Sequence, residues 1–159
     1  FLEMSYALWT NRMQSPDDHL LLLNDKDEGF GRLKNPSFNF DSAAGILYTV
    51  DVTKPEGEKI TITSLADGTP FDLDRTYTVA VNSYRGNGGG DLLTRGAGIP
   101  KEELPRRIVF STDKDLRYYL MKRIEEVGTL DPHPLNHWRF IPEEWAKPAA
   151  ERDRKVLFE

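Results

Sequence analysis

Apolar and polar residues alternate along two neighbouring segments in the first half of the chain. Within residues 45–52, GILYTVDV, every second side chain from Ile46 onward is large and apolar. Successive side chains of an extended chain point to opposite faces, so this pattern predicts a strand with one buried face. After a turn at 54–57, KPEG, the segment 58–65, EKITITSL, continues the pattern, and the pair is predicted to form a hairpin.

Three later segments also have strand character. Residues 76–82, TYTVAVN, follow a turn marked by Asp67-Gly68 and Pro70, and they alternate like the first strand. The shorter segments 107–111, RIVFS, and 138–142, WRFIP, are rich in β-branched and aromatic residues and are predicted as short strands.

Helical spacing occurs at the start of the chain and again in its second half. The opening residues Leu2, Tyr6, Trp9 and Met13 predict an amphipathic helix, and a chain that begins inside a helix is expected to be a fragment. Residues 15–37 are rich in Asp, Asn, Gly and Pro and are predicted to form a long loop.

The second helix is predicted over the segment that ends at Gly128. Its apolar face consists of Leu116, Leu120, Ile124 and Val127. Thr112 and Asp115 have the spacing of a capping box at its start, and Gly128 suits its C-terminal end. Three strands followed by a helix predict an α+β domain, with a mixed, mostly antiparallel sheet and flanking helices, over residues 1–142. Residues 143–159 are predicted as a charged C-terminal tail, with a peripheral helix as the alternative.

Composition excludes several classes of protein. The chain has 159 residues, 38% of them hydrophobic and 30% charged, which is typical of one soluble domain. The longest aliphatic run, residues 20–23, is too short to span a membrane. A net charge of −5 without a basic cluster argues against binding to a nucleic-acid polymer. The chain has no cysteine, which excludes thiol chemistry and disulfides.

The most informative segment is 79–93, VAVNSYRGNGGGDLL. It matches neither the phosphate-binding P-loop nor the dinucleotide fingerprint. Glycines at 88–90 permit positive φ angles and leave the backbone bare, so that a flat ligand could lie against it. Tyr84 would offer a ring face and Arg85 a charge to such a ligand. The alternative is a tight glycine-rich turn that binds nothing.

Two phenylalanines and the three histidines are further candidates for binding or catalysis. Phe38 and Phe40 lie in a polar stretch and could form a slot for a planar ring together with Tyr84, or could cover the edge of the sheet. His133 and His137 are separated by Pro134, which disfavours a helical metal site, and His19 stands alone. We therefore predict no metal site and no catalytic group within this chain.

Two long motifs resemble a known family. They are FNFDSAAGILYTVDV at 38–52 and ITSLADGTPFDLDRTYTVAVNSYRGNGGGD at 62–91, followed by Trp138-Arg139. Together they resemble the C-terminal domain of the 5′-nucleotidases, and more closely the branch of 2′,3′-cyclic-nucleotide 2′-phosphodiesterases. The resemblance covers residues 1 to about 142.

The resemblance implies a two-domain nucleotide phosphohydrolase, periplasmic or secreted. Its missing N-terminal metallophosphoesterase domain would carry two divalent metal ions, whereas this chain would need no cofactor and would be inactive alone. The C-terminal domain would bind the nucleotide or nucleoside by stacking its base on Tyr84. The residues implied in substrate binding are Phe40, Asn82, Tyr84, Arg85, Gly86, Asn87, Gly88, Gly89, Gly90 and Asp91. Here Gly90 precedes Asp91, whereas many 5′-nucleotidases have Asp followed by Gly. The alternative function is a non-catalytic structural or protein-binding module with the same fold.

Overall fold

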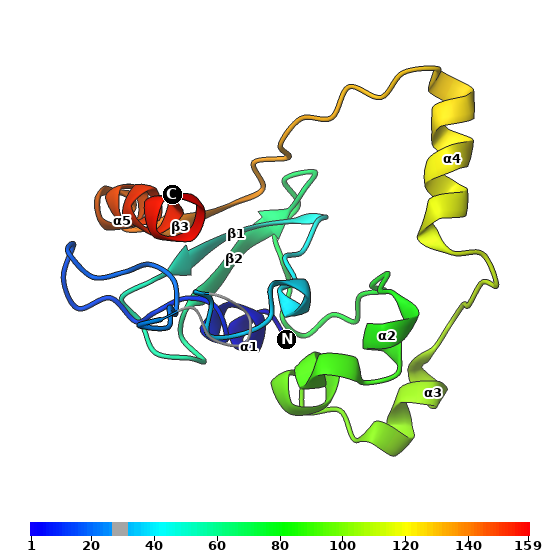
Figure 1. Cartoon of the computed structure of the whole chain (residues 1–159). Coiled ribbons are helices and arrows are strands. Elements are labelled where there is room, and N and C mark those ends of the chain that lie inside the picture. The colour runs from blue at the N-terminus through cyan, green and yellow to red at the C-terminus, as the bar shows by residue number, and fades with distance from the viewer. Residues whose placement is uncertain (27–31) are drawn as a thin grey trace.

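The computed structural model describes residues 1–26 and 32–159 (Figure 1). Residues 27–31, part of the loop predicted at 15–37, lie outside the described residues. The longer elements are α1 (Leu2–Ala7), β1 (Ile46–Asp51), β2 (Ile60–Leu65), α4 (Leu116–Val127), β3 (Trp138–Ile141) and α5 (Glu143–Phe158). Short turns of helix lie between them: η1 (Ser37–Asn39), α2 (Ser83–Gly86), η2 (Gly89–Asp91), η3 (Leu92–Gly96), η4 (Lys101–Glu103) and α3 (Leu104–Arg107).

The sheet of the described chain has three strands in the order β2-β1-β3. β1 pairs antiparallel with β2, as the predicted hairpin requires, and parallel with β3, which arrives from the far end of the chain. The α+β class and the mixed sheet with flanking helices are therefore confirmed. The predicted inner face of β1 is also confirmed, because Tyr48 and Val50 are buried and Leu47 and Thr49 are only partly covered.

An aromatic core joins α1 to this face of the sheet. Tyr6 is fully buried, and its hydroxyl lies 2.8 Å from that of Tyr48. Burial, reinforced by the hydrogen bond to Tyr48, raises the pKa of the Tyr6 phenol. The rings of Phe40 and Trp138 pack edge-on against Tyr6, with centroids 5.1 and 5.2 Å from its own. Helix α1 ends at Ala7, and is therefore shorter than the predicted helix. Met13, which was predicted on the apolar face of that helix, is buried in the core but lies in the loop that follows α1.

Helix α5 covers a second part of the core. Of the alternatives for residues 143–159, the helix is therefore the one found. Ala146 and Ala149 are buried against Met13, Leu20 and Val52. One turn further on, the buried carboxylate of Asp153 accepts a hydrogen bond of 2.7 Å from the Leu21 amide and contacts His19. The C-terminal helix thus fastens the loop that follows α1.

Two predicted strands are wrong. Residues 76–82 lead up to the start of α2 and pair with no other described strand. Of residues 107–111, Arg107 is the last residue of α3, and the others form an irregular segment. Alternation along a chain produces a strand only where a neighbouring strand can accept its hydrogen bonds. Within the described chain neither segment lies beside such a neighbour, and Val79 and Phe110 remain exposed.

Helix α4 is confirmed, with a different start. Its N-cap is Asp115, whose carboxylate accepts a 3.0 Å hydrogen bond from the Tyr118 amide, so the predicted capping box from Thr112 is wrong. Gly128, with φ of 73°, ends the helix as predicted. Two extended segments carry α4 away from the sheet (Figure 1), and none of its residues, all within the described range, is buried.

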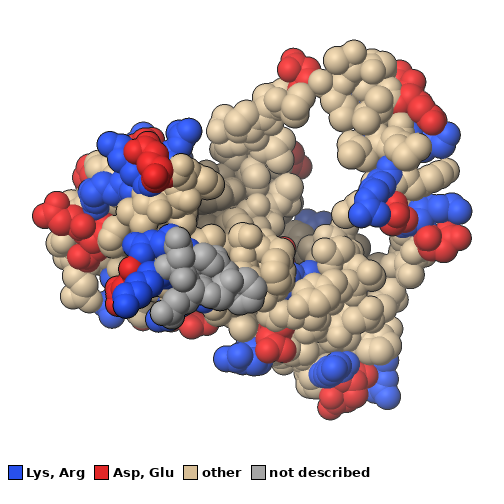
Figure 2. Space-filling model, in the orientation of Figure 1, with Lys and Arg blue, Asp and Glu red and all other residues tan. Residues whose placement is uncertain are grey.

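The visible surface carries both signs of charge. Lys and Arg are interspersed with Asp and Glu over α4 and over the body of the molecule (Figure 2). Among the described helices, none is both long and apolar enough to cross a membrane.

Candidate functional site

The glycine-rich segment begins with a short helix that its own sequence caps. Asn82 is the N-cap of α2, and its side-chain oxygen accepts a 2.8 Å hydrogen bond from the Arg85 amide. Beyond the helix, Gly88 and Gly90 adopt φ angles of 87° and 70°, and Asp91 follows with φ of 61°. These left-handed residues turn the chain, and η2 lies in contact with α2.

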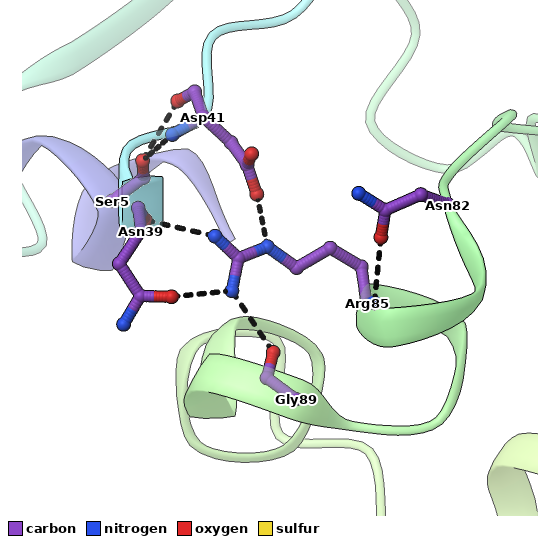
Figure 3. Close-up of polar contacts among 6 residues, drawn as sticks. All are labelled: Ser5, Asn39, Asp41, Asn82, Arg85 and Gly89. Atoms are coloured by element: carbon purple, nitrogen blue, oxygen red, sulfur yellow. Dashed lines mark hydrogen bonds and ion pairs between the residues drawn. The ribbon is translucent and has the colours of Figure 1, made fainter. Parts of the chain in front are cut away.

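The Arg85 side chain joins this segment to the end of η1 and the loop that follows it (Figure 3). Its Nε donates to the Asp41 carboxylate at 2.5 Å, and its two terminal nitrogens donate to the side-chain and backbone oxygens of Asn39, both at 2.9 Å. A further bond of 3.0 Å reaches the Gly89 carbonyl. The residue is only 3% exposed. Four directed bonds account for four of the five guanidinium hydrogens.

Helix α1 holds the same loop from the other side. The Ser5 hydroxyl donates to the Asp41 carbonyl at 2.7 Å and accepts from the Asp41 amide at 2.9 Å (Figure 3). Ser5 is fully buried. Asp41 is therefore fixed through its backbone by α1 and through its carboxylate by Arg85.

Two of the three consecutive glycines are explained by contacts within the chain. A Cβ atom at Gly89 would lie 2.5 Å from the ring of Tyr84. A Cβ atom at Gly90 would overlap Arg85 Nη1 and lie 2.7 Å from Asn39 Oδ1. At Gly88 the positive φ disfavours any side chain, and a Cβ would lie 3.1 Å from Leu104. At Gly89 and Gly90 the bare backbone thus makes room for Tyr84 and Arg85 themselves, whether or not a ligand also lies there.

Tyr84 presents its ring at the surface of this assembly. The residue is 54% exposed, and the Arg85 guanidinium lies 5.2 Å from its ring centroid. With Gly89 in contact with the ring on another side, its position is restricted while part of it remains open to solvent. Within the described residues it stacks on no other aromatic side chain.

The predicted second ring lies elsewhere. Phe40 packs edge-on against Tyr6 and Trp9, with centroid distances of 5.1 and 5.8 Å, and belongs to the aromatic core. Phe38, in η1, is 75% exposed.

The remaining predicted residues are spread along the glycine-rich segment. Gly86 and Asn87 end α2, and the Asp91 carboxylate lies 3.5 Å from the Thr94 hydroxyl and 3.8 Å from Arg95. Sequence reasoning did not single out Asn39, Asp41 or Ser5 as part of the site. The signal for the first two was the motif Asn39-Phe40-Asp41 itself, in which the polar residues, and not the ring, face Arg85.

The described residues do not fit a metal centre. Among them, no three His, Asp or Glu side chains gather where they could share an ion. His133 makes a hydrogen bond of 3.0 Å to the Asp131 carbonyl, two residues before it, and His19 contacts Asp153.

The sequence of this site is similar to that of a known protein family. Residues 13–95, just over half of the chain, match the family model described as 5′-nucleotidase, C-terminal domain. This stretch contains β1, β2, Arg85 with its partners, and the glycines. No solved structure matches the chain.

Three curated relatives carry the names of nucleotide phosphoesterases. The Trifunctional nucleotide phosphoesterase protein YfkN of Bacillus subtilis is 33% identical over 117 residues, covering 67% of this chain and 8% of the relative. The 2′,3′-cyclic-nucleotide 2′-phosphodiesterase/3′-nucleotidases of Salmonella typhimurium and Haemophilus influenzae are 29% and 26% identical over 121 residues, covering 67% of this chain and 17% of each relative. The chain thus spans less than a fifth of the length of these relatives. On the match to residues 13–95, the chain belongs to the family of 5′-nucleotidase C-terminal domains.

Proposed function

We propose that this chain binds the nucleoside part of a nucleotide on behalf of a metal-dependent nucleotide phosphoesterase, with Tyr84 as the platform on which the base stacks. The observation that carries the proposal is the Tyr84 ring, 54% exposed although it is held by Gly89 and Arg85. The relatives named as nucleotide phosphoesterases support the choice of ligand.

An exposed and restrained aromatic ring suits this role energetically. Stacking of a nucleobase on an aromatic side chain contributes about 1–3 kcal/mol, whichever base is present. A ring whose orientation is already restricted loses little conformational freedom when the base arrives, so more of that energy appears as affinity. Tyr84 has only two side-chain torsions, and Gly89 and the Arg85 guanidinium both lie close to its ring.

The rest of the proposed contact surface follows the glycine segment. Asn82, Gly86, Asn87, Gly88, Gly89, Gly90 and Asp91 would surround the sugar and the edge of the base. Phe40 would have to leave Tyr6 and Trp9 to stack on a base. The proposal therefore assigns stacking within this chain to Tyr84.

Phosphate-ester hydrolysis would need groups that the described residues do not bring together. Because no described cluster of His, Asp and Glu fits a metal ion, we assign no step of the reaction to this chain. The two divalent metal ions implied by the family would belong to a separate metallophosphoesterase domain. A periplasmic or secreted location is part of the proposal and rests on the family alone.

Calorimetric titration of the chain with adenosine tests the proposal. Tyr84→Phe should bind like the wild type, because the ring is retained, whereas Tyr84→Ala should lose at least about fivefold in affinity. Tyr118→Ala is a matched control, since Tyr118 is also partly exposed (41%) and also lies near a cation, Lys114, at 5.6 Å.

Two results would contradict the proposal. One is a wild-type chain that does not bind adenosine, and the other is Tyr84→Ala binding as tightly as Tyr118→Ala. The chain would then be better described as a structural or protein-binding module that keeps the fold.

A further inference from the structure

We infer that Arg85 does not contact the ligand but positions Tyr84 and the glycine segment for it, with Asp41 and Asn39 as its anchors. The inference rests on the proposed function, and it reassigns a residue whose charge would otherwise be offered to the nucleotide. Three observations about the described residues support it.

The first observation is that most of the guanidinium hydrogen bonds are already made within the protein. Its bonds to Asp41, Asn39 and Gly89 direct four of five N–H groups into the protein, and the residue is 3% exposed. The charge is balanced by the Asp41 carboxylate at 2.5 Å. A buried charge that lost these partners would be strongly destabilised, so the guanidinium has little freedom to turn towards a ligand.

The second observation is that these bonds cross between distant parts of the chain. Asp41 and Asn39 lie 44 and 46 residues before Arg85 in sequence, and Ser5 of α1 fixes the backbone of Asp41 (Figure 3). Through these contacts α2 and the glycine segment are attached to the rigid aromatic core. The chain before α2 is exposed, and the segment after the glycines is held separately, because η3 packs against α1 and the Phe1 amino group donates a 3.1 Å hydrogen bond to the Gly96 carbonyl. Arg85 fixes the part that lies between these two stretches.

The third observation is that Tyr84 and Arg85, which are neighbours in sequence, both contact Gly89. Arg85 holds the Gly89 carbonyl, while the Tyr84 ring lies against Gly89 and within 5.2 Å of the guanidinium. Displacing Arg85 would therefore release both Gly89 and the ring. The apparent affinity of a ligand that needs this arrangement falls in proportion to the fraction of molecules that keep it.

The test compares adenosine with AMP, which differ by one phosphate group, on Arg85→Lys and Asp41→Asn. Both variants should bind both ligands about tenfold more weakly, because each removes charge-assisted bonds that hold the loop. The ratio of the two affinities should stay at its wild-type value. The double variant should lose little more than either single one, since the partners act as a unit. If Arg85 contacted the phosphate, Arg85→Lys would instead weaken AMP selectively, and this result would overturn the inference.

A second pair of variants leaves Arg85 in place. Gly90→Ala puts a methyl group onto Arg85 Nη1, whereas Gly98→Ala meets nothing within 4 Å. Both glycines have nearly the same φ, 70° and 68°, so the backbone strain of the two substitutions is matched. Gly90→Ala should reproduce the loss seen with Arg85→Lys for both ligands, and Gly98→Ala should not. Equal binding by these two alanine variants would contradict the positioning role, even if Arg85→Lys failed to fold.

Failure of the proposed function can be recognised separately. If the wild type bound neither adenosine nor AMP, the stacking proposal would fail, and amide hydrogen exchange would still test the positioning role. The amides of residues 88–91 should then exchange at least about tenfold faster in Gly90→Ala than in Gly98→Ala. Equal exchange in the two variants would overturn the inference.

Discussion

At the scale of single residues, the ring of Tyr84 and the backbone of Gly89 form the contact on which the site depends. A Cβ atom at position 89 would meet three ring carbons, the nearest at 2.5 Å, which is closer than real Cβ contacts allow. The ring would have to swing away because the backbone beneath it is fixed by Arg85.

Gly89→Ala is therefore expected to displace the ring and to weaken adenosine binding by at least about fivefold, the lower limit of the stacking contribution. Gly98→Ala is the control for binding, because nothing lies within 4 Å of its Cβ. Gly86→Ala is the control for stability, because its Cβ would lie an ordinary 3.8 Å from Val81 and its φ is not positive. That control should stabilise the chain by about 0.4–1 kcal/mol through the unfolded state. Calorimetric titration and urea unfolding measure both effects, and wild-type affinity in Gly89→Ala would show that the ring does not bind the base.

The glycines at 88–90 and Arg85 show which features of a site can be predicted from the sequence. Three glycines in a row suggest that side chains are excluded at 88–90, and in the structure a Cβ atom at each of these positions would lie within 3.1 Å of another side chain. The sequence does not say what excludes them. The neighbours found are Tyr84 and Arg85, and a ligand in addition to them remains a proposal. The partners of Arg85 lie more than 40 residues away, so local pattern could not distinguish a buried ion pair from a ligand contact.

At the scale of elements, α5 carries part of the core on very small side chains. Ala149 is fully buried, and the helix approaches Met13, Leu20 and Val52 closely because no larger residue separates them. Close packing of this kind tolerates added volume poorly.

Ala149→Leu should lower the free energy of unfolding by about 1–3 kcal/mol, because three extra carbon atoms must enter a filled space. Ala150→Leu changes the same residue type on the next position of the helix, where the side chain is exposed, and should stay within about 0.5 kcal/mol of the wild type. Urea denaturation compares them. Two variants of equal stability would mean that α5 does not pack on the core as described.

The strands predicted from alternating apolar residues are found where a neighbouring strand pairs with them. The strands predicted at 45–52, 58–65 and 138–142 are found as β1, β2 and β3, which pair with one another. The segments 76–82 and 107–111 have a comparable pattern but no neighbouring strand among the described residues. The parallel pairing of β1 with β3 joins segments about 90 residues apart, and local periodicity carries no information about such pairing.

At the scale of the whole molecule, the chain consists of a packed body and an outlying helix. The body joins α1, the sheet and α5 (Figure 1). The candidate site is attached to it through the bonds of Arg85 (Figure 3) and through the contact of η3 with α1. Helix α4 lies beyond an open gap in the space-filling view, with Leu116 75% and Leu120 52% exposed (Figure 2). Among the described residues, no three His, Asp or Glu side chains gather where they could share a metal ion.

The purified chain is therefore expected to release no phosphate from 2′,3′-cyclic AMP, 3′-AMP or 5′-AMP, with or without added divalent metal ions. A colorimetric phosphate assay measures this, with a nucleotide phosphoesterase of the family as positive control. Metal-dependent release that persists in Tyr84→Phe and scales with the concentration of the chain would show that a catalytic centre has been overlooked.

A crystal structure of the chain soaked with adenosine would show directly whether a base stacks on Tyr84. We expect the purine over the exposed face of Tyr84, with ring centroids about 4.5–7 Å apart and the sugar beside residues 88–91. An accessible Tyr84 face that stays empty, or adenosine bound elsewhere with Tyr84 untouched, would contradict this expectation.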